Sequence, residues 1–188
     1  MKALVVIDYI NEIANKEGKL AGKGYYDFII KNNTFENLNK LLDYARKNDF
    51  LLIFVKVGFS KDYVEQPKKS LLFGKANEFG ALKLDTWATE FCEELDILKN
   101  DIVIVKNRVS AFYNTNLELI FRNNDIKDVF VAGVATDLAV SNIVREGHDR
   151  DYNMIVVEDC CAAGSEEDHN NSLKILKKIA IVKELKYL

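Results

Sequence analysis

Short apolar segments alternate with longer amphipathic segments along this chain. The apolar segments span residues 3–7, 50–57, 101–105, 128–134 and 153–157, with a shorter one at 180–182. They are rich in β-branched residues and apolar at successive positions, which is typical of strands buried on both faces of a parallel sheet. The pattern therefore predicts up to six strands in one sheet.

The amphipathic segments between these strands have helical periodicity. Residues 34–48 place Phe35, Leu38, Leu41, Leu42 and Ala45 on one helical face, and similar patterns occur at 116–124, 138–149 and 166–178. Alternation of strands and helices predicts an α/β fold, a three-layer α/β/α sandwich around a mostly parallel, doubly wound sheet. Residues 58–98 are less regular and contain the only proline, Pro67. We interpret them as a long excursion over the sheet edge within a single domain, 1–188.

Composition and charge restrict the classes of partner that we expect this chain to bind. The chain is 48% hydrophobic and 29% charged with a formal net charge of −3, and it has no basic stripe, so a nucleic-acid partner is not expected. No apolar segment approaches the ~20 residues of a membrane span. The three cysteines include an adjacent pair, Cys160 and Cys161, and no C-x-x-C motif. This favours a reducing cytoplasm over a disulfide framework.

In an open parallel sheet, ligands bind beyond the carboxyl ends of the strands. Asp8, Lys106 and the turn Gly133–Val140 follow the first, third and fourth predicted strands. Each also has a simpler interpretation, because strand-end carboxylates and lysines are often solvated and a glycine turn can be a plain connection. The turn leads into a helix, where free backbone N–H groups can stabilise an oxyanion.

Taken in order, these motifs resemble the isochorismatase-like cysteine hydrolases, among them nicotinamidases, N-carbamoylsarcosine amidases, ureidoacrylate hydrolases and isochorismatases. The matching motifs are Val6-Ile7-Asp8, Lys106 leading into Ser110-Ala111-Phe112, the Gly133–Val140 turn, and Glu158–Ala163. Residues 81–87 also resemble a loop that many members place over the site. The resemblance covers essentially the whole chain. It implies a hydrolase of a small molecule that forms a homodimer or larger homo-oligomer.

Carried onto this sequence, the resemblance makes Asp8 the general base, Lys106 the third catalytic member and position 139 the nucleophile. A lysine ammonium stabilises a thiolate and keeps a neighbouring carboxylate ionised. The family also has a non-proline cis peptide, which falls at Val134–Ala135 and would direct the N–H groups of Ala135 and Ala139 at the oxyanion.

Several further residues are candidates for substrate binding. Phe59, Trp87, Tyr113 and Thr136 lie in segments that the sheet topology brings near the site, although ordinary packing explains the aromatic ones equally well. Gln66 is similar to a substrate-contacting glutamine of isochorismatases, and Arg108 is of a type that binds carboxylates.

The chain departs from the family pattern at the nucleophile, because position 139 is alanine. Three explanations stay open. The alanine can be an engineered replacement of cysteine. Alternatively it is native, and Asp8 acts as an acid on a vinyl ether, as in isochorismatases, which also lack the cysteine. The third explanation is a catalytically silent binding or scaffold protein. Cys160 and Cys161 are interpreted as packing residues.

No metal and no cofactor are expected. Nicotinamidases bind a divalent metal through an aspartate and two histidines after the second strand, and residues 58–98 contain no histidine. The two histidines, His148 and His169, are predicted on helix surfaces. Nicotinamidase activity is therefore disfavoured.

Overall fold

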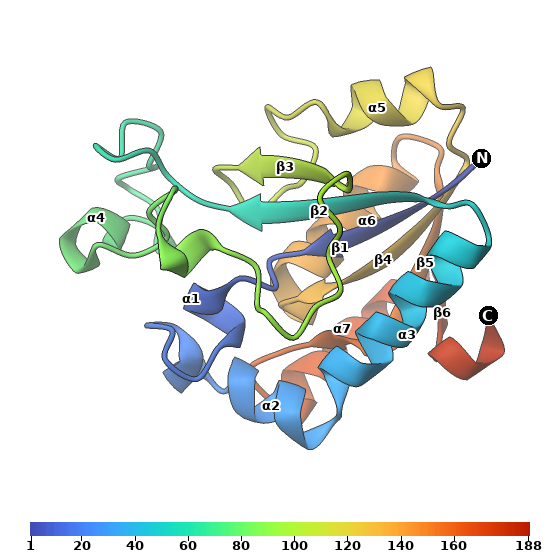
Figure 1. The fold of residues 1–188 in the computed structure, drawn as a ribbon, viewed down its shortest axis with the longest axis horizontal. Coiled ribbons are helices and arrows are strands. Elements are labelled where there is room, and N and C mark those ends of the chain that lie inside the picture. Colours follow the sequence, from blue (N-terminus) through green and yellow to red (C-terminus); the bar gives the residue numbers. More distant parts are fainter.

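A computed structural model describes residues 1–188, and its centre is one six-stranded sheet (Figure 1). The strands are β1 (Lys2–Ile7), β2 (Leu51–Val57), β3 (Ile102–Lys106), β4 (Asp128–Val134), β5 (Asn153–Ala162) and β6 (Ile181–Lys183). Their order is β3-β2-β1-β4-β5-β6, and all five pairings are parallel. The strand order reverses direction at β1, as in a doubly wound sheet.

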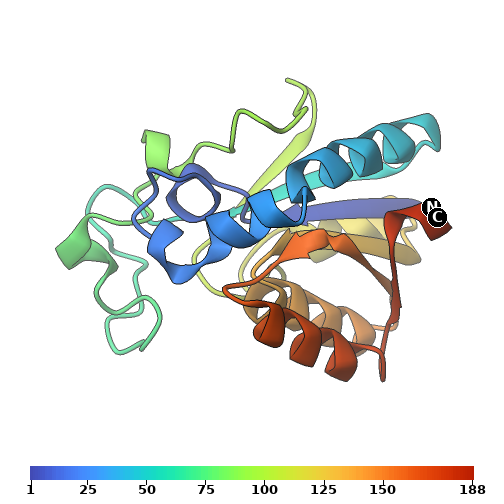
Figure 2. The same ribbon diagram turned by 90° about the horizontal axis from the view of Figure 1, so that it is seen from below.

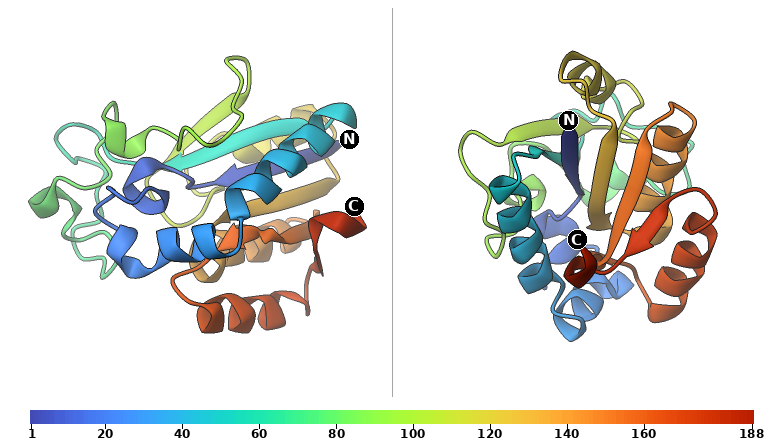
Figure 3. Two further views of the ribbon diagram at one scale, coloured as in Figure 1. Left: turned by 60° about the horizontal axis from the view of Figure 1, so that its bottom comes forward. Right: turned by 90° about the vertical axis from the view of Figure 1, so that its right-hand side faces the viewer.

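Helices cover both faces of the sheet (Figure 2). The helices are α1 (Asn11–Ala14), α2 (Tyr25–Lys31), α3 (Thr34–Lys47), α4 (Ala76–Phe79), α5 (Leu117–Asn123), α6 (Ser141–His148) and α7 (Glu166–Leu176). Single turns occur at η1 (Ala21–Lys23), η2 (Trp87–Thr89) and η4 (Leu185–Tyr187), and η3 (Thr136–Val140) is a π-helical turn. Helix α3 packs on one face of the sheet, and α6 and α7 pack on the other (Figure 3). The predicted three-layer α/β/α sandwich is confirmed.

The alternation of side chains along β1 builds the two cores. Leu4 and Val6 join the core that contains Leu38 and Leu41 of α3. Val5 and its neighbours two residues away point to the opposite face, where helix α6 contributes apolar side chains. A central strand buried on both sides fixes its own register, because a slip by one residue would exchange the two faces.

The edge strand β3 differs from the prediction of burial on both faces. Val103 and Val105 remain 48% and 40% exposed, whereas Ile104 is buried. The cause is position, because β3 lies at the end of the sheet, where helices cover only one of its faces.

Strand β5 is longer than predicted, and it contains Glu158, Asp159, Cys160 and Cys161 rather than ending before them. Between Val131 and Gly133 of β4 the register shifts, so that β5 advances from Val156 to Cys161 over the same distance. A bulge of this kind interrupts the alternation from which a strand is recognised.

The segment between β2 and β3 extends beyond the carboxyl ends of the strands, at the left of Figure 1, and then returns to the start of β3. Two isolated bridges hold it, one between Phe59 and Lys83 and one between Ile10 and Phe91. This long segment therefore covers the end of the sheet where a site is expected. No helix of the structure combines the length and apolar character that crossing a membrane requires.

Candidate active site

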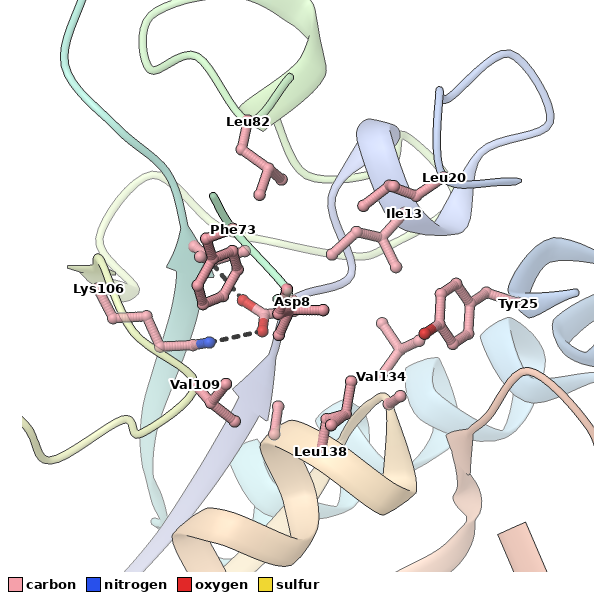
Figure 4. Close-up of a pocket in the computed structure, with 14 residues that line it drawn as sticks. Asp8, Ile13, Leu20, Tyr25, Phe73, Leu82, Lys106, Val109, Val134 and Leu138 are labelled. Carbon is pink, nitrogen blue, oxygen red and sulfur yellow. Dashed lines mark hydrogen bonds and ion pairs between the residues drawn. The ribbon is translucent and has the colours of Figure 1, made fainter. Parts of the chain in front are cut away.

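Asp8 and Lys106 form a buried ion pair at the carboxyl end of the sheet (Figure 4). Lys106 Nζ lies 2.7 Å from Asp8 Oδ2, and the two side chains are 1% and 5% exposed. Lys106 Nζ also donates to the carbonyl of Arg108 at 3.1 Å. The main-chain N–H of Val57 donates to the other carboxylate oxygen, Asp8 Oδ1, at 2.8 Å.

The sheet order explains why these two residues meet. Asp8 follows β1, Lys106 ends β3, and β2 lies between the two strands. Val57 is the register partner of Lys106, so the last residue of β2 stands between the two side chains and supplies a backbone donor. Asp8 has a φ of 61°, in the left-handed region. Aspartate adopts this conformation more readily than most non-glycine residues, and here it turns the chain out of the strand.

Burial and the neighbouring groups act in opposite directions on the Asp8 carboxyl. Loss of solvent raises its pKa above the ordinary value, while the charge of Lys106 and the hydrogen bonds from Lys106 and Val57 lower it. The effect of burial is the largest, so the pKa of Asp8 is raised. A carboxyl group of this kind is suited to proton transfer nearer neutral pH than an ordinary surface aspartate.

The turn after β4 lies beside this pair. The peptide bond between Val134 and Ala135 is cis, at the place that the family resemblance implies. Ala135 and Ala139 both line the pocket together with Asp8 and Lys106. The backbone N–H of Ala135 donates to no acceptor within the protein. An unused backbone donor in a pocket wall is available to an anionic oxygen of a bound molecule.

Hydrogen bonds between buried polar groups hold the turn in place. The Thr136 hydroxyl donates to the carbonyl of Ala162 at 3.0 Å and lies 2.9 Å from Nδ1 of His169. His169 is buried, which contradicts its predicted place on a helix surface. Helix α7 packs against this turn, so the histidine points inward rather than to solvent.

The pocket around the Asp8–Lys106 pair is mainly apolar. Its lining side chains come from the first 25 residues, from the end of β2 and the long segment after it, from the end of β3 and the residues after it, and from the turn after β4 (Figure 4). They are Asp8, Ile13, Leu20, Tyr25, Val57, Leu72, Phe73, Leu82, Lys106, Val109, Val134, Ala135, Leu138 and Ala139. Asp8, Lys106, Val134, Ala135 and Ala139 were identified from the sequence, and the fold brings all five together.

The four residues expected to bind substrate do not line this pocket. Phe59 is fully buried and packs against Phe73, so it supports the wall from behind. Thr136 is also fully buried and faces His169. Trp87 lines a separate hollow with Glu12 and Lys19, and Tyr113 is 61% exposed. Aromatic type and nearness to a strand end therefore do not determine which way a loop side chain points.

Gln66 and Arg108 also lie outside the pocket lining, and their side chains donate hydrogen bonds to backbone carbonyls. The Gln66 side-chain amide donates to the carbonyl of Phe73 at 2.7 Å and so helps to place that wall residue. The Arg108 guanidinium donates to the carbonyls of Glu65 and Asn107. Neither residue is part of the pocket lining.

Tyr25 is the functional candidate that the sequence pattern misses. It begins α2, a helix of seven residues whose preceding residue, Gly24, has a φ of 91° and offers no side-chain cap. A short helix without a capping signal gives little periodicity to detect. In the fold its phenol lies across the pocket from Asp8 (Figure 4).

The three cysteines are buried and away from the pocket lining. Burial raises the pKa of the Cys92 and Cys161 thiols to about 12 and also raises the pKa of Cys160. We therefore expect iodoacetamide to modify none of them in the folded chain near neutral pH, and all three after unfolding in urea. Mass spectrometry of both samples checks this. Rapid modification of any cysteine in the folded chain would show that a reactive thiol exists outside position 139.

The structure contains no group of three or more His, Cys, Asp or Glu side chains placed to hold a metal ion. The chemistry that this site offers through its own side chains is proton transfer by Asp8 next to a fixed ammonium and a free backbone donor.

Comparison with known proteins places the chain in a family. The model of the isochorismatase domain matches residues 2–185. An uncharacterized isochorismatase family protein, YecD of Escherichia coli O157:H7, is 29% identical over 93% of this chain and 80% of its own length. The ureidoacrylate amidohydrolase RutB of Acinetobacter baylyi is 29% identical over 93% of this chain and 76% of its own length.

Solved structures agree with the sequence comparison. The N-carbamoylsarcosine amidase of Thermoplasma acidophilum superposes with a TM-score of 0.76 at 26% identity, covering 98% of this chain and 96% of that one. The match therefore extends over nearly the whole of both chains. This chain belongs to the isochorismatase family of hydrolases.

Proposed function

We propose that this chain hydrolyses a small molecule in the pocket above the sheet, with Asp8 as the group that transfers the proton. The observation that carries this proposal is the buried pair, in which Asp8 and Lys106 lie 2.7 Å apart beside Ala139. A buried ion pair requires strong compensation for lost solvation, and one that faces a pocket is available for chemistry.

Alanine at position 139 excludes a covalent thioester at that residue, so water attacks the substrate directly. We infer an acid-assisted reaction at a vinyl ether or a similar group. Asp8 protonates the terminal carbon of the double bond, and water adds to the carbon that bears the ether oxygen, returning a proton to the Asp8 carboxylate. The adduct, a hemiketal, then breaks its bond to the ether oxygen. Its hydroxyl proton passes to that departing oxygen, so that an alcohol and a ketone are released. The raised pKa of Asp8 favours this role, because the carboxyl keeps its proton at higher pH than usual.

The same frame suits an amide or ureide when a thiol stands at position 139. Similar proteins are an amidohydrolase and an amidase by name. In an Ala139→Cys variant, the ammonium of Lys106 would stabilise the thiolate, Asp8 would accept its proton, and the Ala135 N–H would bind the oxyanion. We expect a homo-oligomer in the cytoplasm.

The test is turnover of a panel of small vinyl ethers, amides and ureides by the chain and by Ala139→Cys. We expect the chain to hydrolyse a vinyl ether without a covalent intermediate, and the cysteine variant to gain activity on an amide or ureide. A thioester adduct in the mass spectrum should appear only with the cysteine variant. If both proteins are inactive on the whole panel, the binding-protein alternative replaces this proposal.

A further inference from the structure

The two charged side chains that line the pocket neutralise each other. Asp8 and Lys106 are the only ionisable side chains of the lining apart from the Tyr25 phenol, and they are paired with each other. Arg108, which follows Lys106 by two residues, donates hydrogen bonds to two backbone carbonyls and is not part of the lining. The pocket therefore offers no free cation to a substrate carboxylate.

The lining side chains at the rim of the pocket are also uncharged. Leu20, Leu72, Val109 and Leu138 are the partly or largely exposed aliphatic members of the lining. Burial raises the pKa of the Tyr25 phenol, and the carboxylates of Asp137 and Asp168 raise it further. A ligand anion placed beside Tyr25 would meet negative charge from both of these groups.

Tyr25 supplies the one uncharged polar side chain. Its hydroxyl makes no hydrogen bond to another residue, and it points into the pocket across from Asp8 (Figure 4). The pocket encloses about 60 Å³, room for a group of a few heavy atoms. A larger molecule therefore fits with one group of that size inside the pocket and its remaining part against the aliphatic rim.

We propose that the substrate is uncharged, with an aliphatic or aromatic body that contacts Leu20, Leu72 and Tyr25, and that the pocket rejects carboxylates. This inference rests on the proposed function in that the pocket holding Asp8 is the substrate site. It separates the chain from its ureidoacrylate-hydrolysing relatives, since an acrylate carries a carboxylate. Moving a carboxylate into an apolar pocket without a partner carries a large desolvation cost.

The experiment compares two amides of equal length and equal number of non-hydrogen atoms. 4-Methylpentanamide ends in an isopropyl group, and succinamate has a carboxylate in its place. Titration of the chain with each, followed by two-dimensional amide NMR, gives both dissociation constants and reports whether Ala135 and Ala139 respond. We expect 4-methylpentanamide to bind at least about tenfold more tightly than succinamate.

Neighbouring leucines provide a matched pair of variants. Leu72 lines the pocket and is 54% exposed, whereas Leu71 is fully exposed and outside the lining. Leu72→Arg places a cation at the rim and should improve succinamate binding about two- to fivefold, the range of a solvent-exposed ion pair. Leu71→Arg adds the same charge nearby and should leave the ratio of the two constants unchanged.

Binding and turnover separate the two proposals. Selective binding of 4-methylpentanamide without turnover by Ala139→Cys supports the uncharged ligand class and counts against the amidase activity expected of that variant. Equal or tighter binding of succinamate overturns the inference even if turnover occurs. The inference is also overturned if neither amide binds, or if Leu71→Arg and Leu72→Arg change the ratio equally.

Discussion

Replacing Lys106 with methionine should lower the free energy of unfolding by about 3–5 kcal/mol at neutral pH. Methionine fills a similar volume but leaves the Asp8 carboxylate buried with the Val57 N–H as its remaining donor. Urea denaturation measured by circular dichroism gives the value. Lys99→Met is the matched control, because Lys99 is exposed and a surface substitution of this kind should stay within about 0.5 kcal/mol.

The loss should depend on pH in a defined direction. Without the ammonium, burial raises the pKa of Asp8 further, so the folded variant keeps a proton that the unfolded chain has already released. Its stability therefore falls as pH rises from the ordinary carboxyl value through the raised one, and the deficit is smallest in acid. Adding Asp8→Asn to Lys106→Met should recover part of the loss at neutral pH. A deficit that is equal at all pH values would contradict the description of Asp8 as the uncompensated charge.

Asp8→Asn should reduce hydrolysis by about 10²–10⁴-fold, the usual contribution of a general acid or base. The role of Asp8 can be read from the direction of the pH profile. In the reaction proposed for the chain with Ala139, the carboxyl acts in its protonated form, so the rate should fall as pH rises through the raised pKa of Asp8. With Ala139→Cys the carboxylate is the active form, and the rate on an amide should rise over the same range.

The control for this experiment is Asp27→Asn, which removes one exposed carboxylate from α2 and changes the net charge by the same amount. It should leave both profiles unchanged. Because Asp8→Asn leaves the Lys106 ammonium without its partner, each variant is assayed where circular dichroism shows it folded. Profiles that run in the same direction for the chain and for its Ala139→Cys variant would rule out the exchange of roles at Asp8.

The strands and the central site residues are predictable from the sequence for a physical reason. Strands buried on both sides must be apolar at nearly every position, so the first polar residues after them stand out. Asp8 and Lys106 are such residues, and parallel strands bring their carboxyl ends to one edge of the sheet. The sequence order of the motifs then gives their neighbourhood without any knowledge of the loops.

The pocket wall is not predictable in the same way. Leu72, Leu82 and Tyr25 come from irregular or short elements, where no periodicity tells which side chain turns inward. Phe59 and Trp87 have the residue type expected of a pocket wall, yet one is core and the other lines a different hollow. Direction in a loop is set by tertiary contacts, such as the Gln66 amide on the Phe73 carbonyl.

The segment between β2 and β3 supplies Leu72, Phe73 and Leu82 but neither member of the ion pair, which is anchored on β1 and β3. One wall of the pocket and the Asp8–Lys106 pair are thus encoded in separate stretches of the gene. Exchanging residues 60–98 for those of a relative would replace one wall of the pocket while leaving the Asp8–Lys106 pair and its sheet intact. The fold thereby permits a change of substrate without a change of chemistry.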